Sequence, residues 1–178
     1  MKSVQKIMGM SLIATSLILA PVSLSETPDV QAAHYTKPYY NYNGYTKNSA
    51  KFVLDPYFVK ALYYDNVKLN GYKVNPKAKV ALGGVPMHIY DASYLKDKNG
   101  KVGYFKFEVK KKTVKKYTFK KAHKKNEILE ESNKSNNPGV PSYIVYKTKG
   151  AVYLASFDKN GYLTGMEVGV VPGFIGLR

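Results

Sequence analysis

Ten lysines lie between residues 106 and 125, and Glu108 is the only acid among them. So many like charges at close spacing repel one another unless an anion lies among them. The anion that best matches repeated positive charge is a polymer with repeated negative charge, such as a phosphate backbone. The stretch therefore predicts a nucleic-acid-binding surface formed by Lys106, Lys110, Lys111, Lys112, Lys115, Lys116, Lys120, Lys121, Lys124 and Lys125.

The type of basic residue indicates how such a surface would work. Of the 28 basic residues, 27 are lysine and one is Arg178, and the net charge is +16. Arginine is the usual bidentate reader of guanine, whereas lysine acts as a point charge. A lysine surface thus predicts phosphate contacts that are independent of base sequence. Two alternatives stay open: codon bias in an AT-rich genome, and a solvated face that keeps the chain soluble.

Tyrosine is the second abundant residue type that could contact a nucleic acid. The chain has 17 tyrosines and no tryptophan. A tyrosine among lysines can stack on an unpaired base, at ~1–3 kcal/mol per base. Tyrosine also packs well on half-exposed strands, and both explanations stay open for the cluster at 35–45. The candidates for base stacking are Tyr39, Tyr40, Tyr42 and Tyr117.

Catalytic and metal-binding patterns are weak in this sequence. The three histidines are scattered, none pairs with another at metal-ligand spacing, and there is no cysteine. His88 is expected in an exposed loop. A metal-dependent nuclease would need clustered carboxylates, for which the only combination worth weighing is Asp55, Asp65 and Asp91. The sequence thus predicts a protein that is not an enzyme and has no cofactor, metal or catalytic residues.

The first 32 residues resemble a secretory signal peptide. Lys2 and Lys6 precede a weakly apolar run at 7–24, and small residues lead to a predicted cleavage after Ala32. The mature chain would then have 178 − 32 = 146 residues, enough for one domain with its own core. We expect it outside the cell, free or held at the surface by charge, with no transmembrane anchor.

The mature chain is expected to begin with a tyrosine- and asparagine-rich segment, 33–48, that becomes a strand near Tyr39. A single α+β domain at 49–178 would follow. Asp55 as N-cap and Pro56 as the first helical residue predict a helix that ends near residue 65. Asn70 and Gly71 predict the turn of a hairpin over 67–74.

The second half of the chain is predicted to be mainly strand. Phe105, Phe107 and Val109 alternate with polar residues after a turn at 97–100, as in a half-buried strand with a basic outer face. Residues 113–125 fit a helix capped by Thr113 slightly better than a strand. A loop at 132–141 precedes three strands at 142–148, 151–158 and 162–170 joined by short turns. The expected fold is a single α+β domain, mainly an antiparallel β-sheet with one or two short helices.

Three segments together resemble a known family. Residues 38–45 (PYYNYNGY), 52–55 (FVLD) and 64–71 (YDNVKLNG) are similar in order and spacing to the immunodominant staphylococcal antigen B family. The resemblance is close over about 38–74, looser through the middle of the chain, and returns around 157–169. It implies a secreted or surface-associated staphylococcal antigen that binds nucleic acid without sequence preference. It implies no catalytic residues and lends support to the helical interpretation of 113–125.

The residues and the resemblance together predict an extracellular, non-enzymatic protein that binds DNA or RNA independently of sequence. One alternative is a binder of teichoic acid or heparin-like polyanions, for which base stacking would not matter. Another is a protein-binding or inhibitory module that docks through its sheet, and such an interface would tolerate high salt.

Overall fold

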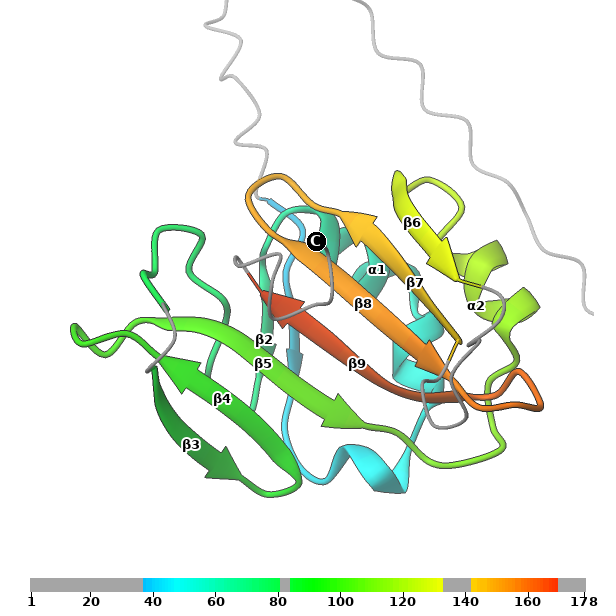
Figure 1. The fold of residues 1–178 in the computed structure, drawn as a ribbon, viewed down its shortest axis with the longest axis horizontal. Helices are drawn as coiled ribbons and strands as arrows, with labels where there is room; N and C mark the ends of the chain where they lie inside the picture. Colours follow the sequence, from blue (N-terminus) through cyan, green and yellow to red (C-terminus); the bar gives the residue numbers. More distant parts are fainter. Residues whose placement is uncertain (1–36, 81–83, 133–141, 170–178) are drawn as a thin grey trace, which may run out of the picture. The chain divides into compact units, whose positions relative to one another are not determined.

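The computed structural model describes residues 37–80, 84–132 and 142–169, all within one compact unit. Seven strands of this part of the chain form an antiparallel sheet in the order β3-β4-β5-β9-β8-β7-β6 (Figure 1). The strands are β3 (Val85–Ile89), β4 (Ala92–Lys96), β5 (Val102–Glu108), β6 (Ile128–Ser132), β7 (Ser142–Lys147), β8 (Val152–Phe157) and β9 (Leu163–Gly169). The predicted α+β domain, mainly an antiparallel sheet with short helices, is confirmed.

The remaining described elements are short. Strands β1 (Tyr40–Tyr42) and β2 (Val67–Leu69) pair in parallel as a separate two-stranded sheet. Two 3-10 helices, η1 (Thr46–Asn48) and η2 (Lys51–Leu54), lead into helix α1 (Pro56–Tyr63), and helix α2 (Lys116–Ala122) follows β5. Strand β1 places part of the tyrosine-rich segment within this fold. No helix in the described ranges is long and apolar enough to cross a membrane.

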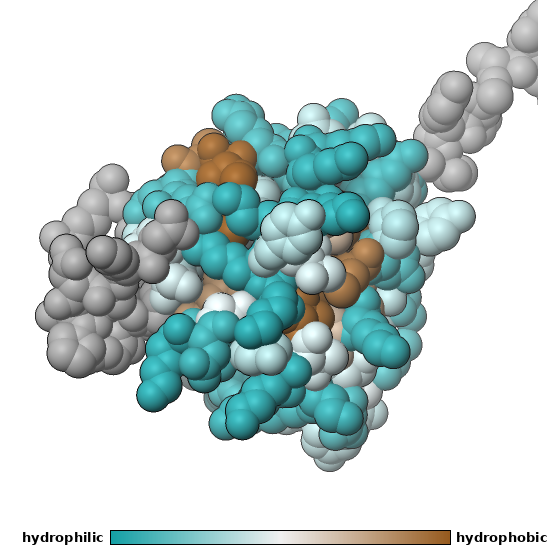
Figure 2. Space-filling model, turned by 90° about the vertical axis from the view of Figure 1, so that its right-hand side faces the viewer, coloured by the Kyte–Doolittle hydropathy of each residue, from teal (hydrophilic) through white to brown (hydrophobic). Residues whose placement is uncertain are grey.

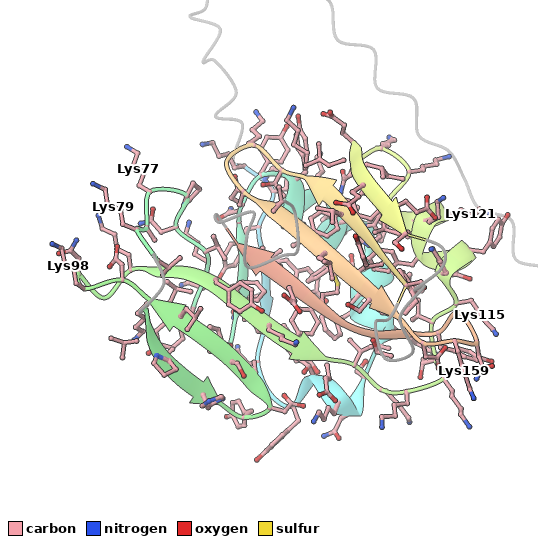
Figure 3. All side chains as sticks on the ribbon, viewed as in Figure 1. Lys77, Lys79, Lys98, Lys115, Lys121 and Lys159 are labelled. Atoms are coloured by element: carbon pink, nitrogen blue, oxygen red, sulfur yellow. The ribbon has the colours of Figure 1, made fainter. Side chains whose placement is uncertain are left out.

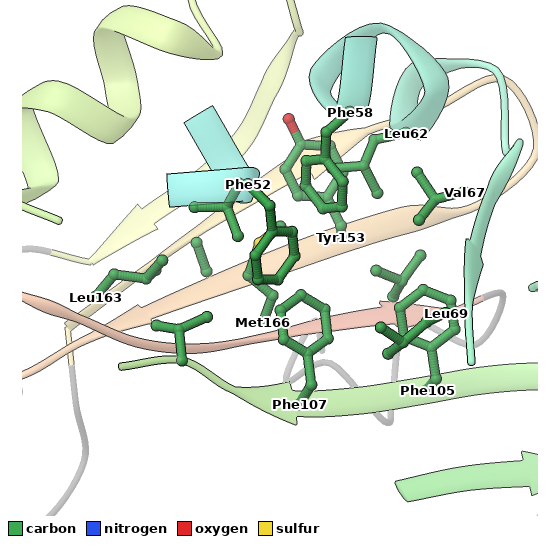
Figure 4. Close-up of a cluster of buried hydrophobic side chains, with 14 of the residues drawn as sticks. Phe52, Phe58, Leu62, Val67, Leu69, Phe105, Phe107, Tyr153, Leu163 and Met166 are labelled. Carbon is green, nitrogen blue, oxygen red and sulfur yellow. The ribbon is translucent and has the colours of Figure 1, made fainter. Parts of the chain in front are cut away.

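Helix α1 begins where the sequence predicts. The Asp55 side chain accepts a hydrogen bond from the Tyr57 amide at 2.7 Å, and Pro56 occupies the first helical position. This cap satisfies one of the amide groups that the first turn leaves without a partner inside the helix. The buried face of α1 includes Phe58 and Leu62, which pack over the seven-stranded sheet (Figure 4).

The core lies between α1, η2 and one face of the sheet. Phe52 from η2 meets Phe58 and Phe107, with ring centroids 5.4 and 5.7 Å apart, and Phe105 and Met166 are fully buried beside them (Figure 4). Burial of a large apolar side chain contributes about 1.5–3 kcal/mol. The predicted alternation along β5 is confirmed, because Phe105 and Phe107 point into this core while Lys106 is exposed.

The C-terminal meander is also confirmed. Strands β7, β8 and β9 pair as antiparallel neighbours. Strand β9 additionally pairs with β5, which lies more than fifty residues earlier in the chain, and so joins the meander to β3-β4-β5.

The hairpin predicted at 67–74 is only partly correct. Asn70 and Gly71 have positive φ values of 50° and 88°, as a tight turn requires. The second arm is a single bridge between Tyr72 and Leu69, and β2 also pairs in parallel with β1. Strands β3, β4 and β6 were not predicted, and His88 lies exposed on β3 rather than in a loop. Most of the predicted loop at 132–141 lies outside the described residues, while Ser132 ends β6.

Within residues 113–125, helix α2 covers Lys116–Ala122, which confirms the slight preference for helix over strand. The N-cap is Lys115 rather than Thr113, and it makes no side-chain cap. Phe119 is fully buried, whereas Tyr117, a candidate for base stacking, is 76% exposed. The sequence pattern therefore indicates the right element but not the residue at which it begins.

Candidate polyanion interface

Seven of the ten lysines predicted to bind nucleic acid are exposed on α2 and its two flanking turns. We call them the α2 lysine surface: Lys110, Lys111, Lys112, Lys115, Lys121, Lys124 and Lys125. Lys115 and Lys121 project from the end of the sheet at which α2 lies, and Lys159 lies at the same end (Figure 3). The space-filling view of this side of the molecule is largely hydrophilic, with small hydrophobic areas between the polar side chains (Figure 2).

The other three lysines of the run are held by acids. Lys106 on β5 pairs with Glu167 at 3.1 Å. Lys116 and Lys120 on α2 both pair with Glu131 on β6, at 3.2 and 2.7 Å. Burial alone would raise the pKa of Glu131, but hydrogen bonds from Lys120 and Lys116 outweigh this effect and lower it. These two lysines thus attach α2 to the edge of the sheet.

All ten carboxylates in the described ranges have a partner within the fold. Glu108 and Glu127 pair with Lys47 and Lys147, and Glu130 accepts a hydrogen bond from the Tyr143 hydroxyl. The others, besides those named above, accept hydrogen bonds at turns, caps or strand ends: Asp55, Asp65, Asp91, Asp97 and Asp158. None of the ion pairs between described residues involves the α2 lysine surface.

The acids considered for a metal site do not come together. Asp55 caps α1, Asp65 accepts a hydrogen bond from Thr148, and Asp91 accepts from the Thr46 and Lys47 amides. Within the described ranges no group of three His, Cys, Asp or Glu side chains could hold a metal ion.

The four tyrosines predicted to stack on bases fall into two pairs. Tyr40 and Tyr42 are half-buried and pack against Phe58 and Phe52, with ring centroids 5.3 and 4.3 Å apart. Their rings already belong to the core, so the packing explanation applies to them. Tyr39 and Tyr117 are 51% and 76% exposed and have faces available to solvent.

A buried histidine attaches the C-terminal end of α2 to the sheet and to η2, a role that sequence reasoning missed. His123 is fully buried and stacks on Phe119. Its Nε2 lies 2.9 Å from the Val53 carbonyl oxygen and its Nδ1 lies 2.8 Å from the Tyr153 hydroxyl. Because a carbonyl only accepts, Nε2 carries the proton and Nδ1 accepts from Tyr153. The Asn126 amide donates to the same hydroxyl at 2.7 Å.

The stacked pair Tyr146 and Tyr153 offers a test of this network. Tyr153→Phe is expected to lower the free energy of unfolding by about 1–3 kcal/mol, because His123 and Asn126 each lose a buried partner. Tyr146→Phe is the matched control, since the buried Tyr146 hydroxyl has no hydrogen-bond partner. We expect Tyr146→Phe to leave stability unchanged or slightly higher, measured by urea unfolding. Equal losses in both variants would contradict the network.

A second group of lysines lies at the opposite end of the seven-stranded sheet. Lys77, Lys79 and Lys98 project there, well away from Lys115 and Lys121 (Figure 3). Sequence reasoning overlooked this group because its members are dispersed along the chain.

Together the fold and its charges define the class: a small α+β domain with a lysine-rich surface beside one short helix. A family profile described as Immunodominant staphylococcal antigen B matches residues 39–168, which is 168 − 38 = 130 of 178 residues. The chain therefore belongs to the immunodominant staphylococcal antigen B family.

Individual relatives match over a shorter stretch. Proteins named Immunodominant staphylococcal antigen B from Staphylococcus aureus strains USA300, NCTC 8325 / PS 47 and COL are each 44% identical to this chain over 62 residues. That stretch is 35% of this chain and 35% of each relative, so it spans about a third of the length of the curated relatives. No solved structure matches the chain.

Proposed function

We propose that this protein is a secreted, non-enzymatic antigen that binds DNA or RNA outside the cell without sequence preference. The α2 lysine surface supplies the contacts. The observation that carries the proposal is the distribution of partners: every described carboxylate is engaged within the fold, while seven neighbouring lysines are exposed and form no ion pair with a described acid. An anion from outside the molecule is what this surface lacks.

The mechanism is neutralisation of phosphates. Each lysine that contacts a phosphate releases condensed counterions, and this release favours binding at low salt. A lysine ammonium on a flexible stem contacts phosphate as a point charge, so the binding depends little on base sequence.

The proposal is tested by fluorescence anisotropy of the mature protein with labelled single- and double-stranded DNA across a salt series. We expect tight binding at low salt that falls steeply as salt rises and is alike for unrelated sequences. Competition by heparin at matched charge reports how far the surface accepts any polyanion. Absence of binding at low salt, or binding of double-stranded DNA that survives high salt, would overturn the proposal in favour of a solvated face or a protein-binding surface.

Removing the charge of Glu131 is expected to strengthen DNA binding, whereas removing a lysine charge is expected to weaken it. Glu131→Gln removes the carboxylate that holds Lys116 and Lys120, so the Lys120 ammonium group becomes available to phosphates, while Lys116 still donates to the Ser132 carbonyl oxygen at 3.4 Å. We expect a several-fold gain in affinity for DNA at low salt, with a steeper salt dependence. Glu127→Gln makes the same change in charge at an exposed pair with Lys147 and is the control. An equal gain in both variants would show that only net charge matters.

A further inference from the structure

A pocket of about 510 Å³ lies between helices α1 and α2. This volume is within the usual range of roughly 300–1,000 Å³ for small-ligand sites. Its apolar lining comes from both helices and from η2, and includes Leu54, Val59, Tyr63 and Ala122. The Tyr63 side chain is 37% exposed, so part of its ring is available to a ligand.

Three ammonium groups accompany this apolar lining. Lys60 comes from α1, and Lys124 and Lys125 come from the turn after α2. No described carboxylate forms an ion pair with any of the three. A ligand that matches both the apolar lining and the three ammonium groups has a flat or apolar body that carries more than one negative charge close to it.

The position of Tyr63 is set by its neighbours. The Lys149 amide donates to the Tyr63 carbonyl at 2.9 Å, and the Lys149 ammonium lies 6.0 Å from the ring centre of Tyr63 and 4.6 Å from that of Tyr64. The Tyr63 and Tyr64 rings meet edge to face with centroids 5.1 Å apart. A ring held in this way presents a stacking surface at little cost in side-chain entropy.

A second, more open hollow adjoins the pocket and offers a path along which a polymer could continue. The two share Leu54 and Pro56, and the second hollow extends past Lys51 and Tyr57 to Thr113, beside the α2 lysine surface. Its one carboxylate, Asp55, accepts a hydrogen bond from the Tyr57 amide as the cap of α1. A ligand with charges repeated along its length can occupy the pocket and continue along this path, whereas an isolated anionic amphiphile would fill the pocket alone.

We propose that the pocket between α1 and α2 receives one unpaired base of a single-stranded nucleic acid, stacked against Tyr63, with the flanking phosphates on Lys60, Lys124 and Lys125. This inference rests on the proposed function and adds a preference for single strands over duplexes. Unlike the lysine contacts, the base contact is short-ranged and apolar, so it persists as salt rises.

The test uses two labelled strands of twelve phosphates, one of thymidines and one entirely abasic. Both carry the same backbone charge, so their affinity ratio isolates the bases. We expect the wild-type protein to bind the thymidine strand about tenfold more tightly, as one stacked base supports. Tyr63→Ala should bring the ratio close to one and leave the salt slope unchanged, while Tyr63→Phe keeps the ring and should preserve the ratio.

Two further variants complete the design. Ala122→Leu narrows the pocket from the α2 side without altering Tyr63 and should also reduce the ratio. Tyr90→Ala removes another tyrosine, which is 58% exposed in the β3–β4 turn and does not line the pocket, and should leave the ratio intact.

The outcomes separate the two proposals. Equal wild-type affinity for the two strands, with steep salt dependence retained, overturns the base pocket and leaves the polyanion surface standing. A preference for thymidine that survives both Tyr63→Ala and Ala122→Leu also overturns the pocket. Failure of the wild-type protein to bind either strand at low salt overturns the proposed function itself.

Discussion

Replacing Lys111, Lys121 and Lys124 with glutamine is expected to weaken DNA binding equally for all sequences and to flatten its salt dependence. Each lysine that contacts a phosphate contributes about 0.9 to the slope of log affinity against log salt, so three contribute up to about 2.7. At about 0.1 M salt the loss of affinity should be on the order of 10²-fold. Anisotropy titrations at four or more salt concentrations measure both quantities. All three side chains are exposed, so the fold should be unaffected.

The matched control changes the same number of charges at the other end of the sheet. Lys77, Lys79 and Lys98 are also exposed lysines, but they lie far from α2 (Figure 3). Their replacement with glutamine should lower the slope much less, because charges farther from the ligand than the Debye length of ~10 Å are largely screened. If the two triple variants lose affinity alike, binding follows net charge and the α2 lysine surface has no special role.

Acid is expected to destabilise the protein through His123. Burial lowers the pKa of His123 from 6.5 to about 4, and the hydrogen bond to Val53 opposes this effect only in part. The unfolded chain, with its ordinary histidine pKa, therefore binds a proton between about pH 6.5 and pH 4 while the folded protein does not. In this window the unfolding free energy falls as the pH falls. A difference of about 2.5 between the two pKa values corresponds to roughly 3 kcal/mol.

Urea unfolding at several values between about pH 7 and pH 4 measures this loss. His123→Gln removes the titrating group, so its stability should vary less over the same window, although it starts lower because a buried network is broken. His88→Gln is the control, since His88 is exposed on β3. A wild-type stability that is the same at both ends of the window would contradict a buried, neutral His123.

Three carboxylates with lowered pKa values, Asp91, Asp97 and Glu131, affect stability at more acidic pH. The pKa of Asp91 is lowered because the amides of Lys47 and Thr46 outweigh the effect of its burial, and that of Glu131 is lowered by Lys120 and Lys116. Their contribution to stability is present above the ordinary carboxyl pKa and is lost as the pH falls below it. The pH range in which His123 affects the unfolding free energy lies mostly above the range in which these carboxylates do. Comparing the wild-type protein with His123→Gln therefore separates the histidine contribution from the carboxylate contribution.

Local features of this fold follow from the sequence by itself. Asp55 and Pro56 determine the start of α1, because a cap and a fixed φ act within one turn of the chain. The alternation at Phe105 and Phe107 indicates which face of β5 is buried, and short turns identify the C-terminal meander. The charge of the lysine run is likewise a property of the sequence, as is the family resemblance.

Which strands pair with each other, when they lie far apart in the chain, is visible only in the tertiary structure. Strand β2 has the residues of a hairpin, yet it pairs in parallel with β1, since neighbouring sequence does not specify which strand edge is available. Strands β3 and β6 contain no fully buried residue that would identify them, and they take their place through pairing in the sheet.

The same limit applies to the candidate site. Composition identifies the lysines, but only the fold shows that Lys116 and Lys120 are held by Glu131 while Lys121 and Lys124 face solvent. It also assigns the ring of Tyr42 to the core and places Tyr63 at a pocket. The physical reason is that charge and propensity belong to a residue and its neighbours, whereas burial and pairing depend on side chains that only the folded chain brings together.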